Sequence, residues 1–362
     1  MAEKNRLAAL ADRLRHFPAR PLTKVMEVCG THTVAIRRAG IQHLLPETVK
    51  LVSGPGCPVC VTPDHFIDEA VSLARRGVIV TSFGDMLRVP GSRSSLEEER
   101  ATGSDIRAVY SPLDALEIAA ASGRETVFLA VGFETTAPAI AAAGMMALER
   151  KIANFSLLTA LRLVPPALQA LTGGGSAAPS PWGIAEDARL SGFLLPGHVS
   201  AIIGRQAYGF LAARRLPGVI SGFGAEDIIT SLLHLLEMIN KDIYKIVNNY
   251  PRVVRDRGNA RSRAVLAQVF EPADAEWRGL GLIPASGLRL RPAYAALDAR
   301  RRFAIRVDGA PARKGCRCGD VLRGLIDPPA CPAFNKACRP DRPLGPCMVS
   351  SEGSCSAWVT YG

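Results

Sequence analysis

Apolar and polar residues alternate along this chain in blocks that predict short strands, glycine-containing loops and helices. Apolar runs that end in glycine predict strands in two series. The first series lies at residues 23–30, 49–60 and 76–85, and the second at 126–134, 155–163, 192–200 and 217–227. Helical spacing of apolar residues fills the intervals, at Lys4–His16, Val34–Gly40, Pro63–Arg76, Pro138–Arg150, Pro165–Leu171, Ala201–Tyr208 and Glu226–Asn249.

Strand, loop, helix and strand in this order are typical of parallel α/β architecture. We therefore predict two parallel-sheet α/β domains, at residues 1–122 and 123–250, followed by a small irregular cysteine-rich domain. The segment Arg252–Arg306 is basic and has few strand signals, so we interpret it as a connector. Connector and cysteine-rich domain together form the third predicted part, residues 251–362.

Composition narrows the class of protein. The 362 residues are 48% hydrophobic, enough for a large core. No run of about 18 apolar residues predicts a membrane span, and the N-terminus lacks the pattern of an export signal, so we expect a cytoplasmic protein and no membrane partner. The net charge of +11 comes from arginines spread through every segment without interleaved aromatic residues, which argues against nucleic acid as a partner.

The cysteines form two groups, which we call the N-terminal and the C-terminal cysteine stations. Three cysteines lie near the start, and six lie within the last 50 positions at Cys316, Cys318, Cys331, Cys338, Cys347 and Cys355. The last four are separated by proline-rich segments that favour an irregular loop around a compact group. Such a loop suits a 4Fe-4S cluster, which needs four converging thiolates.

Two alternatives to a cluster remain open for the C-terminal cysteines. A structural zinc ion also takes four thiolates, but its ligands usually come in pairs separated by two to four residues, and Cys316 and Cys318 are closer than that. Disulfides or free thiols are the other alternative, disfavoured in a reducing compartment.

The chemically capable residues outside the tail follow the predicted strands, where ligands bind in open parallel sheets. Cys29 comes directly before a glycine at such a strand end. A helix N-terminus there would lower the pKa of its thiol, and thiolate is the form that binds iron. The alternative is a buried cysteine that packs as a small apolar residue.

Cys57 and Cys60 form a CxxC turn after a predicted strand. This spacing is typical of redox dithiols, in which the first thiol attacks and the second resolves the mixed disulfide. A metal-binding or structural pair is the alternative interpretation.

Three further residues are candidates. Glu134 lies in an apolar stretch, where an unpaired carboxylate costs free energy, and His198 follows a strand and a glycine. A helix-capping carboxylate and a core histidine are their structural alternatives. His32 lies beside Cys29, where it could hydrogen-bond to ligands of a bound iron.

Six blocks of the chain resemble the HypD family, in the order in which that family has them. They are MEVCGTHT, GPGCPVC, FGDMLRVPGS, GFETTAP, PGHVSAIIG and GPCMVSSEGSC, and the likeness runs from about Lys24 to Trp358. The resemblance implies a maturation factor that helps to assemble the Fe(CN)2CO group of nickel-iron hydrogenases. It also implies a HypC-like chaperone and a HypE-like cyanide donor as partners, and a 4Fe-4S cluster in the C-terminal domain.

The resemblance assigns roles to the cysteines. It implies that Cys29 binds the iron that carries cyanide and carbon monoxide, with a second thiolate from the HypC-like partner. We expect the cluster on the four cysteines of the proline-rich loop, Cys331, Cys338, Cys347 and Cys355. Cys316 and Cys318 would then serve as an electron relay, although either fits the spacing of a cluster ligand nearly as well.

Two functional hypotheses from different classes follow. The first is an assembly scaffold that holds iron at Cys29 and receives redox equivalents from the cluster and the CxxC dithiol. The second is a cluster-dependent thiol-disulfide oxidoreductase, which would have no need of Cys29. The sequence lacks the GxxxxGK[ST], GxSxG and HExxH motifs, so it supports no standard hydrolase.

Overall fold

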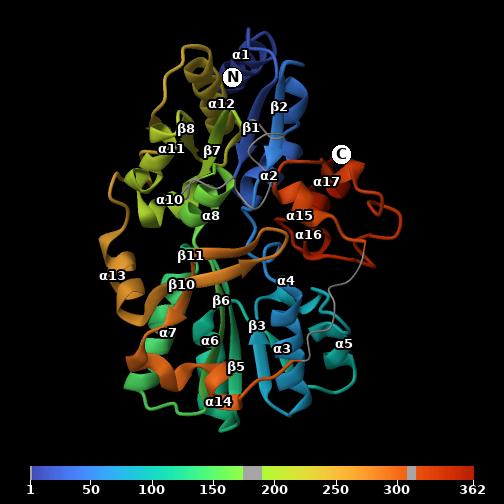
Figure 1. Cartoon of the computed structure of the whole chain (residues 1–362), viewed down its shortest axis with the longest axis vertical. Helices are drawn as coiled ribbons and strands as arrows, with labels where there is room; N and C mark the ends of the chain where they lie inside the picture. Colours follow the sequence, from blue (N-terminus) through green and yellow to red (C-terminus); the bar gives the residue numbers. More distant parts are fainter. Residues whose placement is uncertain (1, 174–189, 308–314) are drawn as a thin grey trace.

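The computed structural model describes residues 2–173, 190–307 and 315–362. Two parallel β-sheets lie at opposite ends of an elongated molecule, and an antiparallel hairpin and the C-terminal segment lie between them (Figure 1). The predicted α/β class with two parallel sheets is confirmed. No helix in the described ranges is long and apolar enough to cross a membrane.

The first sheet has five strands that come from both halves of the chain. In spatial order they are β2 (Val49–Ser53), β1 (Thr23–Glu27), β7 (Gly192–Pro196), β8 (Gly218–Ser221) and β9 (Ile246–Asn248). All neighbours are parallel, and Val25 of β1 lies opposite Leu51 on one side and Gly192 on the other. The helices of this end are α1 (Ala2–Arg15), α2 (Gly30–Arg38), α10 (Gly197–Ile203), α11 (Gly209–Ala213) and α12 (Ala225–Asn240).

The second sheet has four parallel strands from one continuous part of the chain. Their order is β4 (Ile106–Ala108), β3 (Ile79–Ser82), β5 (Thr126–Gly132) and β6 (Phe155–Leu161). β5 is buried along its whole length, as expected for a central strand covered on both faces. The helices of this end are α3 (Asp64–Arg75), α4 (Gly84–Leu87), α5 (Leu96–Ala101), α6 (Pro112–Ser122) and α7 (Ala137–Glu149). Helix α8 (Val164–Leu171) follows β6, but its buried residues belong to the apolar core of the first sheet, and it lies beside α10 (Figure 1).

The remaining elements connect the two ends. Helix α13 (Ala260–Val269) leads into the antiparallel strands β10 (Phe270–Trp277) and β11 (Gly281–Leu290), and α14 (Ala299–Phe303) follows. The cysteine-rich segment contains only the short helices α15 (Cys318–Leu322), α16 (Pro346–Val349) and α17 (Ser354–Tyr361). Single 3-10 turns lie at Ile41–Leu44, Arg205–Tyr208, Pro292–Leu297 and Pro328–Ala330.

The sheets group the strands differently from the predicted ranges 1–122 and 123–250. β5 and β6, expected in the second domain, lie in one sheet with β3 and β4, while β1 and β2 share a sheet with β7 to β9. The apolar pattern of a strand predicts that the strand is buried. It does not predict which strand lies beside it, because crossover connections allow strands far apart in the chain to pair.

Two local expectations were wrong. The interval 226–249 is not one helix, because α12 ends at Asn240 and β9 follows after Asp242 turns the backbone into the left-handed region. The predicted connector contains the long hairpin β10–β11. Buried apolar residues alternate in these strands with exposed residues, arginine and glutamate among them. This alternation weakens the apolar pattern by which the sequence predicts a strand.

The hairpin turn meets the cysteine-rich segment backbone to backbone. Gly279 has a φ of +74°, and a Cβ added at Gly319 in α15 would lie 2.6 Å from the Gly279 Cα. Close approach of this kind requires glycine on both sides. The contact therefore fixes how α15 lies against the hairpin.

We expect Gly319→Ala to destabilise the protein by about 1–3 kcal/mol, because the added methyl group overfills this contact. Gly84→Ala is the matched control, since a Cβ at Gly84, also in a short helix, meets no atom within 4 Å. Denaturant unfolding of both variants measures the difference. Equal stabilities would show that the hairpin and α15 can separate without loss.

Candidate functional site

Cys29 lies where the first sheet meets the CPVC loop. It follows β1 and stands at the N-terminus of α2 with an extended backbone. Gly30 donates its N–H to the Gly56 carbonyl at 3.0 Å, and a Cβ at Gly56 would collide with the Cys29 backbone. The loop that carries Cys57 is thus packed directly against the residue that carries the Cys29 thiol.

Glu27 stabilises this turn through hydrogen bonds. Its buried carboxylate accepts hydrogen bonds from the Cys29 N–H at 3.0 Å and from the Thr33 hydroxyl at 2.5 Å. Burial raises the pKa of Glu27 to about 7. Sequence analysis missed this residue, although it has the same signal as Glu134, a carboxylate at the end of an apolar strand.

The Cys29 thiol is buried, with 8% of its surface exposed. Burial raises its pKa to about 12, and the nearby Glu352 and Glu27 carboxylates add to the effect. The helix N-terminus was expected to lower this pKa, but desolvation outweighs the N–H of His32 that points at the sulfur. The group therefore stays a thiol until a cation replaces its proton.

Two histidines flank one phenylalanine beside Cys29. The ring of buried His32 lies 4.7 Å from that of Phe223, and the ring of exposed His198 lies 4.0 Å from it on centroids. His32 Nε2 donates to the Gly222 carbonyl at 2.9 Å, and burial lowers its pKa to about 4. Its Nδ1 has no partner among the described residues, so the neutral ring keeps one buried acceptor.

The C-terminal segment packs against the start of α2, next to Cys29. Glu352 accepts a hydrogen bond from the Thr31 hydroxyl at 2.6 Å, and a Cβ at Gly30 would lie 2.5 Å from the Glu352 Cβ. Arg37 of α2 stacks on the Trp358 ring of α17, 3.3 Å from its centroid. Sequence analysis missed Glu352 because its partner, Thr31, lies 321 positions away in the chain.

Glu134 follows β5 of the second sheet and is 2% exposed. One carboxylate oxygen accepts the Val164 N–H at the start of α8, at 2.9 Å, so the side chain caps that helix. The other oxygen has no partner among the described residues, and burial raises the pKa of Glu134 to about 7. Burial raises the pKa of Tyr208, and the charges of Glu134 and Cys29 raise it further, so the three groups lie near one another.

Cys57 and Cys60 are joined by a disulfide in the part of the loop that follows Gly56. Both are buried, and the Cys60 N–H donates to the Cys57 sulfur at 3.2 Å. They belong to the same buried apolar cluster as Cys347. The N-terminal and C-terminal cysteine stations are therefore neighbours in the core.

All six C-terminal cysteines gather in one place. Five of them, Cys316, Cys318, Cys331, Cys338 and Cys355, line a cavity of about 20 Å³, and Cys347 interacts with Cys318 and Cys355. Thiols of Cys316 and Cys347 donate to Cys318 and hold its pKa well below the usual range. Burial raises the pKa of Cys338. The structure thus brings the expected cluster and relay cysteines together without separating the two sets.

Arg278, at the turn of the hairpin, links the two cysteine stations. Its N–H donates to the Val61 carbonyl at 2.8 Å, next to the disulfide, and its guanidinium pairs with buried Asp64 at the start of α3. Burial opposes its charge, but the Cys318 and Cys316 sulfurs raise its pKa. Sequence analysis missed Arg278 because it stands in a segment with many arginines.

The fold and the site define a class: an α/β protein in which a cysteine-rich C-terminal segment packs against a CxxC loop and a buried cysteine at a strand end. The chain belongs to the HypD family of hydrogenase maturation factors. The model of that family, described as "HypD: Hydrogenase formation hypA family", matches residues 5–362. The resemblance seen in the six motif blocks is thereby confirmed.

Curated relatives agree over nearly the full length. The chain is 44% identical to the hydrogenase maturation factor HypD of Rhodobacter capsulatus, covering 98% of this chain and 93% of the relative. Identity to HypD of Azotobacter vinelandii is also 44%, over 99% and 92% of the two chains. HypD of Escherichia coli K12 is 41% identical, over 97% and 92%.

Glu134 gives a prediction for the pH dependence of stability. Its pKa is raised from 4.5 to about 7 on folding, so folding favours the protonated form. The cost of the ionised form is absent below pH 4.5, grows as pH rises, and reaches about 3 kcal/mol above pH 7. We expect the stability of the wild type, relative to Glu134→Gln, to fall between pH 4.5 and 7 in denaturant unfolding. A gap independent of pH would contradict it.

The Arg278–Asp64 ion pair gives a second prediction. Its side chains are only 12% and 8% exposed, so Arg278→Met and Asp64→Asn should each cost about 3–5 kcal/mol. The double variant should lose clearly less than the sum, because no unpaired charge remains buried. Arg317 and Asp320, 50% and 18% exposed, form the control pair, with a coupling below about 1 kcal/mol. Additive losses at Arg278 and Asp64 would refute the coupling.

Proposed function

We propose that this hydrogenase maturation factor is a scaffold on which the Fe(CN)2CO group of a nickel-iron hydrogenase is assembled. The iron with its diatomic ligands is the cargo, and Cys29 is its protein ligand. The observation that carries the proposal is the position of the Cys29 thiol. Among the described cysteines it alone belongs neither to the disulfide nor to the C-terminal group, and it lies at a strand end between the CPVC loop and Glu352.

The residues around Cys29 suit such a cargo. A thiolate is a soft ligand and matches low-spin iron that bears cyanide and carbon monoxide. Because burial keeps the free thiol protonated, iron binding releases a proton, and the carboxylates of Glu27 and Glu352 lie near enough to influence it. The turn that follows Cys29 also carries two polar groups. They are the Thr31 hydroxyl and the Nδ1 of His32, which has no hydrogen-bond partner among the described residues.

We further propose that the C-terminal cysteines hold a 4Fe-4S cluster, which would supply electrons one at a time. Cys331, Cys338, Cys347 and Cys355 are the preferred ligands, with Cys316 and Cys318 as relay or substitutes. Five thiols around one small cavity, with Cys347 beside Cys318 and Cys355, are a donor set that fits this group. No three of the described His, Cys, Asp and Glu side chains are arranged to hold a single metal ion.

The Cys57–Cys60 pair would exchange two electrons and two protons between its disulfide and dithiol forms. A HypC-like chaperone would bring a second thiolate to the iron at Cys29, and a HypE-like protein would deliver cyanide. We expect this work to take place in the cytoplasm, where the dithiol can be kept reduced.

A second function, a cluster-dependent thiol-disulfide oxidoreductase, is favoured by one observation. The Cys57–Cys60 disulfide packs in the same buried cluster as Cys347 and Cys318, so electrons would have a short path between the two stations. This function uses every cysteine except Cys29. The two proposals therefore make opposite predictions for that residue.

Protein purified without oxygen in complex with its chaperone should show infrared bands of cyanide and carbon monoxide. We expect Cys29→Ala to abolish these bands and to leave the visible absorption of the cluster unchanged, because its sulfur does not belong to the C-terminal cysteine group. The paired variant Cys57→Ala should retain the cluster but cannot form the disulfide, so it should lose the two-electron exchange of this pair. Bands that persist in Cys29→Ala would remove Cys29 from the scaffold and favour the oxidoreductase.

A further inference from the structure

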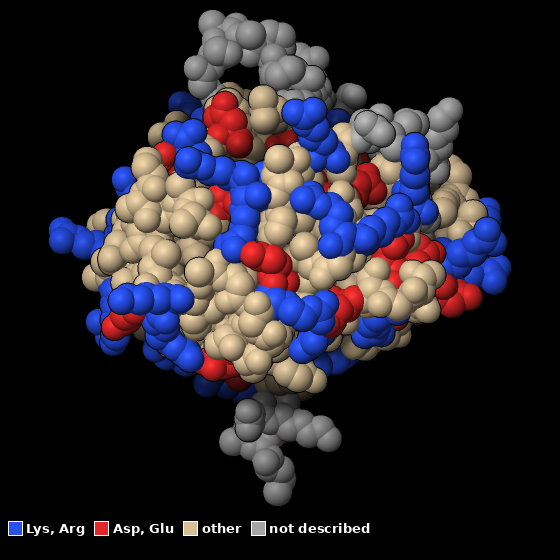
Figure 2. All heavy atoms as spheres, turned by 90° about the horizontal axis from the view of Figure 1, so that it is seen from below, with Lys and Arg blue, Asp and Glu red and all other residues tan. Residues whose placement is uncertain are grey.

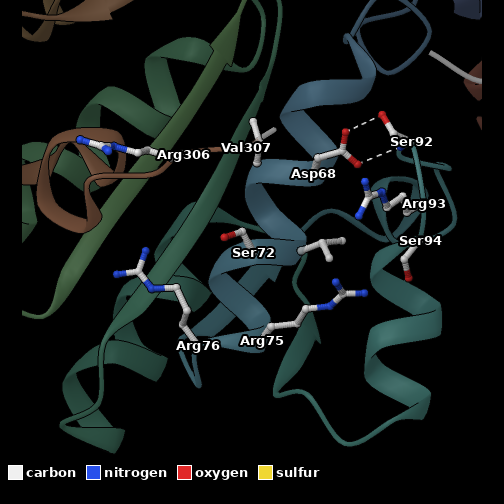
Figure 3. A pocket seen from close by; sticks show the side chains of 10 residues that line it. Asp68, Ser72, Arg75, Arg76, Ser92, Arg93, Ser94, Arg306 and Val307 are labelled. Atoms are coloured by element: carbon white, nitrogen blue, oxygen red, sulfur yellow. Dashed lines mark hydrogen bonds between the residues drawn. The ribbon is translucent and has the colours of Figure 1, made fainter. Parts of the chain in front are cut away.

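The arginines beside α3, at the far end of the molecule, do not converge on one anion. The cavity at this helix has a volume of about 310 Å³, and both oxygens of Asp68 in its lining accept hydrogen bonds from Ser92. Figure 3 shows the Arg306 guanidinium pointing away from this cavity and from Arg93. Acidic and basic side chains are interspersed on the face shown in Figure 2. Neither feature defines a binding site, whereas the surroundings of Cys29 contain an aromatic cluster without an assigned role.

Phe223 is the centre of this cluster. It lies in the loop between β8 and α12, at the end of the molecule that holds the first sheet (Figure 1). Its ring centroid lies 4.0 Å from that of His198 and 4.7 Å from that of His32. Burial lowers the pKa of His198 and the Glu352 carboxylate opposes this, so His198 lies near the residue that packs beside Cys29. Phe223 therefore contacts both histidines of the candidate site.

The imidazole of His198 depends on this ring for its orientation. His198 is exposed, and within the described ranges it has no hydrogen bond or ion pair. Such a side chain ordinarily moves among several rotamers, because no bond compensates for the lost rotamer freedom. Contact between aromatic rings favours a defined geometry. The ring of Phe223 is thus the contact that restricts the imidazole of His198.

The loop that carries Phe223 is itself fixed. The Gly222 carbonyl accepts a hydrogen bond from His32 Nε2 at 2.9 Å, and a Cβ at Gly222 would collide with the Asp227 carboxylate and lie 2.9 Å from the Tyr250 ring. Arg252 holds both of these neighbours, because it pairs with Asp227 at 2.6 Å and lies 4.4 Å from the centroid of the Tyr250 ring. The loop therefore has little room to move.

The backbone that carries His198 packs against the same loop. A Cβ at Gly197, the residue before it, would collide with the Ser221 carbonyl and lie 3.3 Å from the Phe223 ring. Close approach of this kind requires glycine. The backbone of His198 and the ring of Phe223 are thus held together, and the rotamer of the imidazole is what the ring contact decides.

We propose that Phe223 is a positioning residue, which holds the His198 imidazole beside Cys29 ready to donate a hydrogen bond to a cyanide ligand of the bound iron. The cyanide part of this inference rests on the proposed function, and the ring contact does not. A neutral imidazole carries one N–H donor and one acceptor nitrogen. Because a phenyl ring has no nitrogen or oxygen atom, it orients the imidazole and leaves both of these groups available. A donor that is fixed in advance loses less freedom when its acceptor arrives.

Nuclear magnetic resonance of the full chain with labelled histidine tests the ring contact. The chain has 6 histidines, and His198→Gln identifies the signal of His198 by its loss. We expect Phe223→Leu, which keeps an apolar side chain but removes the ring, to abolish the ring-current shift of that signal, and Phe223→Tyr to retain it. Phe303→Leu is the matched control, since it makes the same change in α14, beside the second sheet, and should leave the signal in place. A His198 signal that does not move in folded Phe223→Leu would overturn the positioning role.

Infrared spectra of the complex with its chaperone test the hydrogen bond to cyanide. We expect His198→Gln and Phe223→Leu to shift the cyanide bands in the same direction, and the double variant to shift them no further than His198→Gln alone. Phe223→Tyr should keep the wild-type positions. Additive shifts, or bands that stay in place in Phe223→Leu, would overturn the action of Phe223 through His198. Absence of the bands from the wild-type complex would instead contradict the proposed function, and the histidine signals would still decide the ring contact.

Discussion

The structure depends on the docking of residues 350–352 onto the strand ends of both sheets. Asp85, after β3, accepts hydrogen bonds from the Ser350 hydroxyl at 3.1 Å and the Ser351 N–H at 3.0 Å. Glu352, the next residue, accepts from Thr31 after β1. One tripeptide thus connects two sheets that share no strand, and it carries the helices with Cys347 and Cys355 into the space between them.

Desolvation controls the chemistry of the central residues. Burial moves the pKa of Cys29 and Glu134 upward and that of His32 downward, so each group favours its neutral form. Neutral groups can be buried together at small cost, whereas the same set of charges could not. A site of this kind is stable because its buried groups are uncharged.

The sequence predicted the α/β class and the main strands because buried parallel strands give long apolar runs. It also predicted that Cys29, Cys57, Glu134 and His198 follow strands, as they do. Strand order could not be predicted, because the pairing of β1 with β7 joins residues far apart in the chain. This pairing brings His32 close to Phe223 and His198, which follow the paired strands β8 and β7.

Sequence analysis missed three residues of the site, Glu27, Arg278 and Glu352, for two different reasons. The bonds of Glu27 are local, and the rule applied to Glu134 would have found it. Arg278 and Glu352 bind groups more than 200 positions away, Asp64 and Thr31, so no local pattern distinguishes them from other charged residues. In the folded chain Glu352 lies beside Cys29, and Arg278 lies beside Cys316 and Cys318.

The contact between Gly56 and Cys29 has a mechanical consequence. The disulfide loop and the strand-end turn share a hydrogen bond and have no side-chain atoms between them. If opening the ring of Cys57 and Cys60 shifts Gly56, the displacement reaches the Cys29 amide without passing through any flexible intermediate. The backbone that carries the Cys57–Cys60 ring and the backbone that carries the Cys29 thiol are thus held as one unit.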